Sequence, residues 1–298
     1  MTFTFKQRKA NLIKLCQKTK LSKITDLISA GSVNNNNLSY IQDTSKMLLQ
    51  SCIAGSSKKI RFNNNFDDVM KVIKKNKPEN ITHNGLVVVR KESSAEYAIF
   101  LKSLFCFLKE IGLMEKIDYF ISPPQLRIKL GKKSNNHNAS DLIHSDAWTP
   151  YNTDKSYTLY LPVYGDCKRN YVAFFKPKNS FEADWLKPKK FEDGNEIGAR
   201  YKKVNLNYKI GKFYVSDCAT LHQSILLKNA EPRVSIDMGF IAKKVFRSPQ
   251  NHSHVKARDL AGIGYNKFMI FKDSYDDELQ KILSRKKQSL ANRKIIKY

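Results

Sequence analysis

The chain of 298 residues can bury the core of one large or two small domains, and its 53 Lys and Arg against 27 Asp and Glu give a net charge of +26. Such a charge favours an anionic partner, whether a phosphorylated metabolite, a nucleic acid or a membrane surface, although charge spread along the chain also serves solubility alone. Five widely spaced cysteines without a Cys-x-x-Cys pair, and no run of eighteen apolar residues, argue against a disulfide framework, a cysteine zinc site and a transmembrane helix, and predict a soluble, cytoplasmic protein.

Helical periodicity marks the first 80 residues, which we predict to form an N-terminal helical region. Apolar residues at helical spacing run over 12–28, before Gly31, and over 38–53, before Gly55. The asparagines 34–37 between these segments predict a loop.

Strand patterns dominate from residue 81 to residue 245. The β-branched run 86–89 predicts a buried strand, and residues 96–111, apolar on most faces, predict a helix packed against a sheet. Short strand-like segments separated by turn residues follow at 126–130, 157–163, 171–176, 211–216 and 234–242. The pattern predicts a mainly β protein with helical additions, an α+β fold whose double-stranded β-helix (jelly-roll) core spans 81–245 as the catalytic domain.

Two segments stand apart from this core. The insertion 177–203 carries Trp185, Phe191 and Tyr201, and a loop of this length is typical of a functional or a mobile segment. Residues 246–298 are predicted to form a basic helical C-terminal extension.

Two histidines and an aspartate form the most informative motif. His144-Ser145-Asp146 is followed far downstream by His222, which comes after an apolar strand and a turn. Residues i and i+2 of a strand share a face, so we expect His144 and Asp146 side by side, with His222 supplied by a late strand that folds back. Two imidazoles and one carboxylate are the set that binds one face of iron(II) in non-haem oxygenases. A chance His-x-Asp is the competing interpretation.

Arg233 stands eleven residues after His222 (233 − 222 = 11) in an otherwise apolar strand, and Ser235 shares its strand face. A buried guanidinium is costly unless it meets a carboxylate, which it matches in bidentate geometry. We therefore predict a carboxylate-binding site made by Arg233 and Ser235. An edge-strand arginine that pairs with a surface acid is the alternative.

Further candidates flank this site. Arg127 is a second inward cation for a cosubstrate or substrate carboxylate, and Tyr160 and Thr158 are candidates for hydrogen bonds to the same ligand. Trp148 either shapes the substrate mouth or packs in the core. The histidines in 252–254 lack a carboxylate partner at a useful spacing, which indicates a solvated loop.

Together the His-x-Asp pair, the distal histidine and the Arg-x-Ser at this offset resemble the iron(II)/2-oxoglutarate-dependent dioxygenases, nearest the phytanoyl-CoA dioxygenase-like branch, over about residues 85–245. The resemblance implies that His144, Asp146 and His222 bind iron(II), that Arg233 and Ser235 hold the cosubstrate 2-oxoglutarate, and that O2 is the oxidant. It implies a hydroxylase that attacks an unactivated C–H bond and releases succinate and CO2. Desaturation or another oxidative outcome stays open.

Lysines near the predicted site favour a small anionic substrate, such as a sugar, an amino-acid-like metabolite or an acyl compound. They are Lys129, Lys132, Lys133, Lys176, Lys178, Lys202 and Lys203. Two alternatives stay open: an oxygenase that acts on nucleic acid or protein, whose nucleic-acid binding would weaken with salt, and a non-catalytic basic binding protein on a jelly-roll scaffold. The sequence leaves the oligomeric state open.

Overall fold

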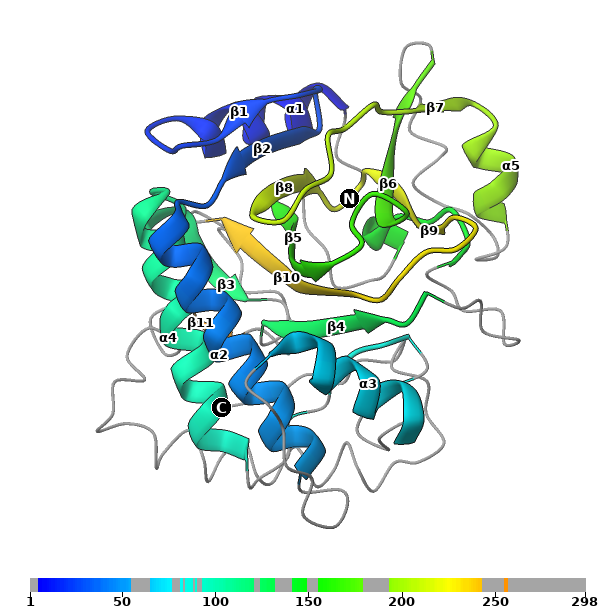
Figure 1. Cartoon of the computed structure of the whole chain (residues 1–298). Helices are drawn as coiled ribbons and strands as arrows, with labels where there is room; N and C mark the ends of the chain where they lie inside the picture. Colours follow the sequence, from blue (N-terminus) through cyan, green and yellow to red (C-terminus); the bar gives the residue numbers. More distant parts are fainter. Residues whose placement is uncertain are drawn as a thin grey trace.

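Two β-sheets and a set of helices make up the part of the chain that the computed structural model describes (Figure 1). The described residues are 5–54, 65–76, 81–82, 84–87, 89, 93–120, 124–131, 141–148, 155–178, 193–242 and 255–256. Helices and strands are mixed along the chain, so the predicted α+β class is confirmed.

The larger sheet has eight strands, in the order β1-β2-β8-β5-β10-β3-β11, with β4 pairing β10 outside this path. The strands are β1 (Ser22–Lys23), β2 (Ile28–Ser32), β3 (Ile117–Phe120), β4 (Gln125–Lys129), β5 (Ser156–Gly165), β8 (Lys212–Asp217), β10 (Arg233–Ala242) and β11 (Val255–Lys256). β5 and β10 pair antiparallel from Gly165 opposite Arg233 to Ser156 opposite Ile241. This long ladder forms the middle of the sheet.

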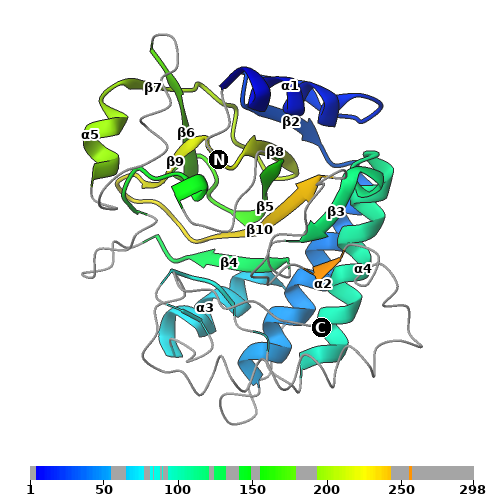
Figure 2. The same cartoon turned by 180° about the vertical axis from the view of Figure 1, so that it is seen from behind.

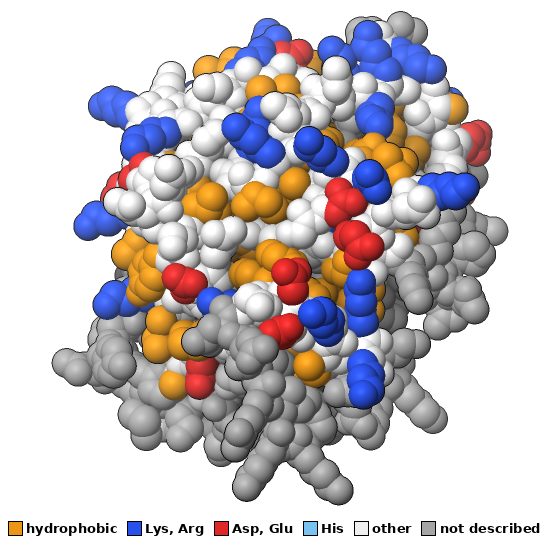
Figure 3. Space-filling model, viewed as in Figure 1, with side chains coloured by type: hydrophobic (Ala, Val, Ile, Leu, Met, Phe, Trp, Pro, Cys, Tyr) orange, Lys and Arg blue, Asp and Glu red, His pale blue; other side chains and the backbone are white. Residues whose placement is uncertain are grey.

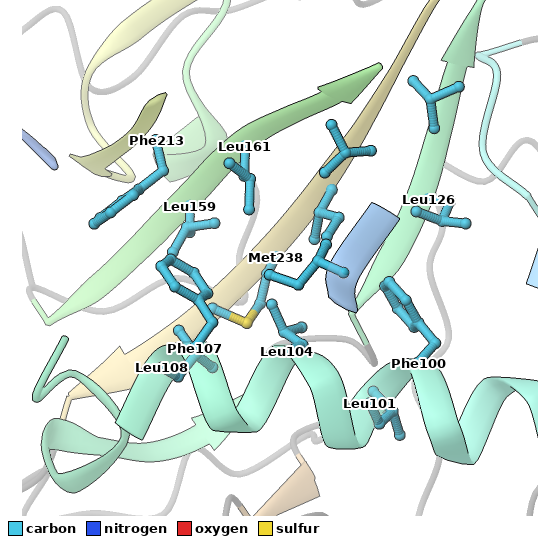
Figure 4. Packing of buried hydrophobic residues seen from close by; sticks show 14 of the residues in the cluster. Phe100, Leu101, Leu104, Phe107, Leu108, Leu126, Leu159, Leu161, Phe213 and Met238 are labelled. Carbon is cyan, nitrogen blue, oxygen red and sulfur yellow. The ribbon is translucent and has the colours of Figure 1, made fainter. Parts of the chain in front are cut away.

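Helices cover one face of the large sheet. The helical elements are α1 (Phe5–Cys16), α2 (Asn35–Ala54), α3 (Phe66–Asn76), α4 (Ser94–Glu110) and α5 (Gly194–Gly198), with the 3₁₀ turns η2 (Met114–Lys116) and η4 (Asp146–Trp148). α2 and α4 lie side by side, and Leu104, Phe107 and Leu108 of α4 are packed with Leu159 and Met238 of the sheet (Figure 4). Burying one side chain of this size contributes about 1.5–3 kcal/mol to the stability of the fold. The larger cluster of buried residues lies in this layer between helices and sheet.

The opposite face of the large sheet meets the smaller, three-stranded sheet. Its strands, in the order β7-β6-β9, are β7 (Tyr201–Lys203), β6 (Asn170–Pro177) and β9 (Leu221–Leu226). Tyr160 and Tyr214 of the large sheet pack with Tyr171 and Phe174 of β6, and the ring centroids of Phe174 and Tyr214 are 6.1 Å apart. We call this face of the large sheet the inner face. Figure 2 shows α5 and β7 on the side of the molecule away from α2 and α4.

The predicted helix 96–111 and the five strands predicted between residues 126 and 242 are confirmed within two residues at each end. α4 ends because Gly112 takes a positive φ of 73°, with its N–H donating to the Lys109 carbonyl (3.0 Å). The Leu113 N–H reaches the Leu108 carbonyl at 2.9 Å, which completes a Schellman motif.

The predicted helix 12–28 is wrong beyond residue 16. α1 ends at Cys16, and Lys18 takes a positive φ of 58° that turns the chain. β1 and β2 then form a hairpin, and β2 pairs with β8 from Ile28 opposite Ser216 to Ser32 opposite Lys212. Pairing with a distant strand overrides the helical spacing of the apolar residues. Part of the first 80 residues therefore belongs to the large sheet.

Other local predictions also need correction. The asparagine run 34–37 begins α2 rather than forming a loop, because the Asn34 carboxamide oxygen accepts the Asn37 N–H at 2.8 Å as an N-cap does. Within the predicted strand 86–89, Leu86 and Val87 form isolated bridges, and residue 88 lies outside the described residues. α3, β3 and β7 are elements that the sequence did not predict, whereas β9 is the late strand expected to supply His222.

Several predictions fall outside the described residues. These are Trp185 and Phe191 of the insertion, the histidines in 252–254 and the C-terminal helix. The division of the chain at residues 80 and 245 stays a prediction. Among the helices of the described segments, none has the length and apolar character to span a bilayer.

Candidate metal centre

His144, Asp146 and His222 come together although 76 residues separate the last two (222 − 146 = 76). Each offers one ligand atom, and the three atoms lie within 4.8 Å of one another. His222 lies on β9 and Asp146 begins η4. The backbones of His144 and His222 form a two-way bridge, with N–H to carbonyl distances of 3.0 and 2.8 Å. The His-x-Asp segment is thus joined to β9 by an isolated bridge rather than by a regular strand.

Ser145, between the two ligands, points away from them. Its hydroxyl donates to the Cys218 carbonyl at 2.9 Å, and the Ala147 N–H reaches the same oxygen at 3.0 Å. These contacts anchor the segment between His144 and Asp146. Because Asp146 begins η4, the two residues do not lie in the strand from which the i, i+2 spacing predicted a shared face.

Both histidines are oriented through their Nδ1 atoms. His144 Nδ1 lies 2.8 Å from the Leu142 carbonyl, and His222 Nδ1 lies 3.1 Å from the Thr220 carbonyl. A carbonyl only accepts, so each neutral imidazole carries its proton on Nδ1 and presents the Nε2 lone pair. Burial, and secondarily the charge of His222, lowers the pKa of His144, which favours the neutral form that binds metals.

The Asp146 carboxylate is fixed from the large sheet. The Thr158 hydroxyl on β5 donates to Asp146 Oδ2 at 2.9 Å, while Oδ1 lies 4.0 Å from His222 Nε2. Thr158 therefore holds one carboxylate oxygen and leaves the other directed to the histidines.

Arg233, at the start of β10, is the largest fully buried side chain among the described residues, with 0% exposure. Its Nη1 donates to the Asn170 carbonyl at 3.2 Å, and its guanidinium carbon lies 5.2 Å from the Tyr160 ring centroid. Its Nε and Nη2 find no hydrogen-bond partner among the residues that the structure describes. An uncompensated buried guanidinium is costly, which points to a carboxylate ligand.

Strand register places this guanidinium and the ligands on the same inner face. Alternate residues of β10 from Arg233 to Asp237 share one face, and Asp237 stands opposite Tyr160. Two residues along β5 from Tyr160 is Thr158, whose hydroxyl binds Asp146. One face of the β5–β10 ladder therefore runs from Arg233 to the metal-ligand group. Ser235 is fully buried on the same face.

Arg127 also reaches the inner face, where its Nε forms an ion pair with the Asp237 carboxylate. Its Nη1 donates to the Asn84 carbonyl at 3.0 Å, and the Ser235 hydroxyl lies 3.3 Å from the other Asp237 oxygen. The charge of Arg127 is thus matched within the protein, unlike that of Arg233. The sequence reading missed Asp237, although the alternation Arg-Val-Ser-Ile-Asp on β10 puts it on the face of Arg233.

Tyr160 and Trp148 lie in different surroundings. Tyr160 is 3% exposed on the inner face, and burial raises its pKa. Its hydroxyl has no hydrogen-bond partner within the described segments. Trp148 packs against the small cluster of Tyr201 and Leu221 and lies beside Gly194 of α5. Trp148 is partly buried there, and its role at the substrate mouth stays a prediction.

Four of the seven lysines that favoured an anionic substrate are exposed, namely Lys176, Lys178, Lys202 and Lys203. The Lys203 ammonium donates to the Tyr171 hydroxyl at 2.8 Å, and Lys178 donates to the Ala199 carbonyl at 2.9 Å. Lys132 and Lys133 lie outside the described residues. On the face shown in Figure 3, Lys and Arg side chains are scattered, with acidic side chains between them. The net charge does not form one patch on this face.

Lys129 is the exception, because it stands opposite Arg233 in the β4–β10 ladder. Its ammonium lies 3.6 Å from the Asp141 carboxylate. Burial is the largest influence and lowers the pKa of Lys129 to about 8. With Arg233 and Arg127, the inner face thus carries a third cation, Lys129, whose charged form burial makes less favourable than that of an ordinary lysine.

Replacing Lys129 by methionine is expected to stabilise the protein at neutral pH. The unfolded chain binds the Lys129 proton more tightly than the folded one, so the penalty is complete below pH 8 and disappears as the pH rises toward the ordinary lysine value. We expect Lys129→Met to raise the free energy of unfolding by about 1–3 kcal/mol at pH 7 and by much less at pH 10. Urea unfolding at both pH values measures this, and a gain that is equal at both would contradict it.

No protein-family model matches the chain, and no curated protein matches it. Similar chains occur among solved structures, and three of them share 9%, 11% and 13% identity with this chain. The non-haem alpha-ketoglutarate-dependent carbocyclase SnoK from nogalamycin biosynthesis has 9% identity and a TM-score of 0.46, over 81% of this chain and 87% of that one. The epimerase SnoN from the same biosynthesis has 11% identity and a TM-score of 0.38, over 78% and 83%. EctD from S. alaskensis, with 2-oxoglutarate and 5-hydroxyectoine, has 13% identity and a TM-score of 0.40, over 81% and 77%.

Proposed function

We propose that the protein is an iron(II)- and 2-oxoglutarate-dependent oxygenase of the phytanoyl-CoA dioxygenase-like branch, which hydroxylates a C–H bond of a small molecule. One observation carries the proposal: a two-histidine, one-aspartate group and an uncompensated buried arginine share the inner face. Either feature alone has simpler explanations. Their combination on one face is what this cosubstrate chemistry requires.

The three ligands suit iron(II). Two neutral imidazole nitrogens and one carboxylate oxygen are the donor set of the facial triad, which leaves further coordination positions open. The bonds from His144 and His222 to backbone carbonyls, and from Thr158 to Asp146, are the outer contacts that hold such ligands. When bound, iron(II) and 2-oxoglutarate supply the oxidising chemistry with O2.

Arg233 suits the far carboxylate of 2-oxoglutarate. Its partnerless Nε and Nη2 are adjacent donors of the guanidinium fork, and a carboxylate binds such a pair with two parallel hydrogen bonds. The buried Ser235, next on the same strand face, would add its hydroxyl, and Tyr160 its phenol. Arg127 stays a prediction as a second contact, since Asp237 already matches its charge.

The chain itself contributes orientation and the exclusion of water. Phe174 packs 6.2 Å from the His222 ring, and Tyr214 packs against Phe174 on the inner face. Aromatic side chains around the ligands keep the surroundings apolar, which strengthens the electrostatic interactions of Arg233 and Asp146 with whatever binds there. Two facing sheets with the ligands between them support the double-stranded β-helix interpretation of the core.

The inner face also bears on the substrate. Arg127 pairs with Asp237, and Lys129 pairs with Asp141. We assign Arg233, whose Nε and Nη2 have no hydrogen-bond partner among the described residues, to the cosubstrate. A small-molecule substrate remains our proposal, and its anionic character and the cytoplasmic location stay predictions. Figure 3 gives no concentrated basic patch that would favour nucleic acid on that face.

Anaerobic titration of the metal-free protein with iron(II) and 2-oxoglutarate tests the proposal. We expect the weak visible charge-transfer band of the chelate only when both are present. Folded protein that gives no band with either order of addition would overturn the proposal and leave a binding role. Once the band is established, succinate release with candidate metabolites identifies the substrate.

A further inference from the structure

The turn between β8 and β9, residues 217–220, contacts both halves of the metal centre. The Cys218 carbonyl accepts the Ser145 hydroxyl at 2.9 Å and the Ala147 N–H at 3.0 Å. The Thr220 carbonyl lies 3.1 Å from His222 Nδ1. Carbonyl groups of one short turn thus orient the His-x-Asp segment and the distal histidine.

This turn is held from the N-terminal end of the chain. Arg8 of α1 donates to Asp217 Oδ1 at 2.8 Å across 209 positions of sequence, and the two residues are 4% and 0% exposed. The Leu27 carbonyl accepts the Asp217 N–H at 2.9 Å and the Thr220 hydroxyl at 3.2 Å. Asp217 Oδ1 also accepts the Ala219 N–H at 2.8 Å, so the carboxylate links Arg8 to the turn's own backbone.

A buried ion pair is a poor source of stability, because the desolvation of two charges offsets their attraction. Its value lies in geometry, since a planar guanidinium fixes the direction of the carboxylate that it meets. The Arg8 guanidinium also lies 3.6 Å from Cys218 Sγ, so it contacts two successive residues of the turn. These contacts set the position of the carbonyl that binds Ser145.

We infer that Arg8 is a positioning residue of the metal centre, which acts through Asp217 and the turn 217–220 on His144, Asp146 and His222. α1 then contributes to metal binding through Arg8, although it supplies no metal ligand itself. The inference rests on the proposed function, because it requires that the three ligands bind a metal.

Cobalt(II) titration of the metal-free protein, followed by visible absorption, tests the inference without turnover. We expect Arg8→Met to weaken cobalt binding about 10–100-fold, the range typical of lost outer contacts, and to change the cobalt spectrum. Lys9→Met is the matched control. It removes a cation from the next position of α1, and the Lys9 ammonium pairs with an exposed Asp26 at 3.2 Å. We expect wild-type affinity and spectrum from it.

A second variant separates positioning from folding. Arg8→Met leaves Asp217 buried without its cation, so we also expect reduced stability. In Arg8→Met/Asp217→Asn the uncompensated charge is absent, and we expect a folded protein that still binds cobalt about tenfold or more weakly. Wild-type affinity and spectrum in the folded double variant would overturn the inference and leave the proposed function intact. Wild-type protein that binds no cobalt would overturn the proposed function, and the inference with it.

Discussion

Arg233→Met is expected to remove 2-oxoglutarate binding and, in the absence of ligand, to stabilise the protein. The guanidinium is fully buried with two nitrogens unsatisfied within the described segments, so the ligand-free protein bears an uncompensated charge. Methionine fills a similar volume without that charge, and we expect a gain of about 1–3 kcal/mol in the free energy of unfolding. The loss of one partner of a buried charge pair costs about 2–5 kcal/mol of binding, which is about 30-fold to several thousand-fold in the dissociation constant. Urea unfolding and titration of the charge-transfer band measure the two effects.

Two other arginines make this prediction specific. Arg127→Met leaves Asp237 without its cation, so we expect lower stability, opposite in sign to Arg233→Met, with a smaller effect on cosubstrate binding. Arg169→Met removes an exposed guanidinium that donates to the Asn229 carbonyl at 3.2 Å, and we expect neither property to change. If Arg233→Met destabilised the ligand-free protein and left 2-oxoglutarate binding unchanged, Arg233 would be a structural arginine and the cosubstrate assignment would fail.

The three candidate metal ligands could be predicted from the sequence because only a few residue types bind iron(II). His144 and Asp146 lie two residues apart, and His222 follows far downstream after an apolar strand. The structure brings the ligand atoms of the three residues within 4.8 Å of one another. Arg233 stood out for a related reason, as a cation among the apolar residues Val234, Ile236, Met238 and Phe240 of its strand. Residues whose type contradicts their surroundings are the ones that sequence patterns reveal.

The supporting contacts could not be read in the same way. Arg8 and Asp217 are unremarkable singly, and only the pairing of β2 with β8 brings α1 near the turn before His222. The same long-range pairing explains why the helix predicted over 12–28 is wrong. The spacing of apolar residues there suits a helix, but pairing with β8 makes Ile28 the first residue of a strand. The charge balance of Arg127 was equally hidden, because the cross-strand register decides which residues meet Asp237.

The largest loss of metal binding is expected from the ligands themselves. His222→Ala removes one of three protein donors, so we expect the dissociation constant for iron(II) or cobalt(II) to rise more than 100-fold, beyond the about 10–100-fold typical of outer contacts. Thr158→Val, which frees Asp146 Oδ2, is expected to fall within that smaller range. We expect the larger effect from His222→Ala because it deletes a metal ligand. Thr158→Val only removes a hydrogen bond that orients the ligand Asp146.

Thermal unfolding with and without metal gives a readout independent of colour and turnover. A metal present at about 100 times its dissociation constant stabilises the folded protein by about 2.7 kcal/mol, so added cobalt(II) raises the melting temperature of the wild type. We expect this increase to vanish in His222→Ala and to shrink in Thr158→Val. His252→Ala is the matched histidine control, because the sequence predicts a solvated loop there, and its increase should equal that of the wild type. If the increase in His222→Ala equalled that of the wild type, cobalt(II) would bind at another place in the chain. His222 would then not be a metal ligand, and the proposed chemistry would lose its metal centre.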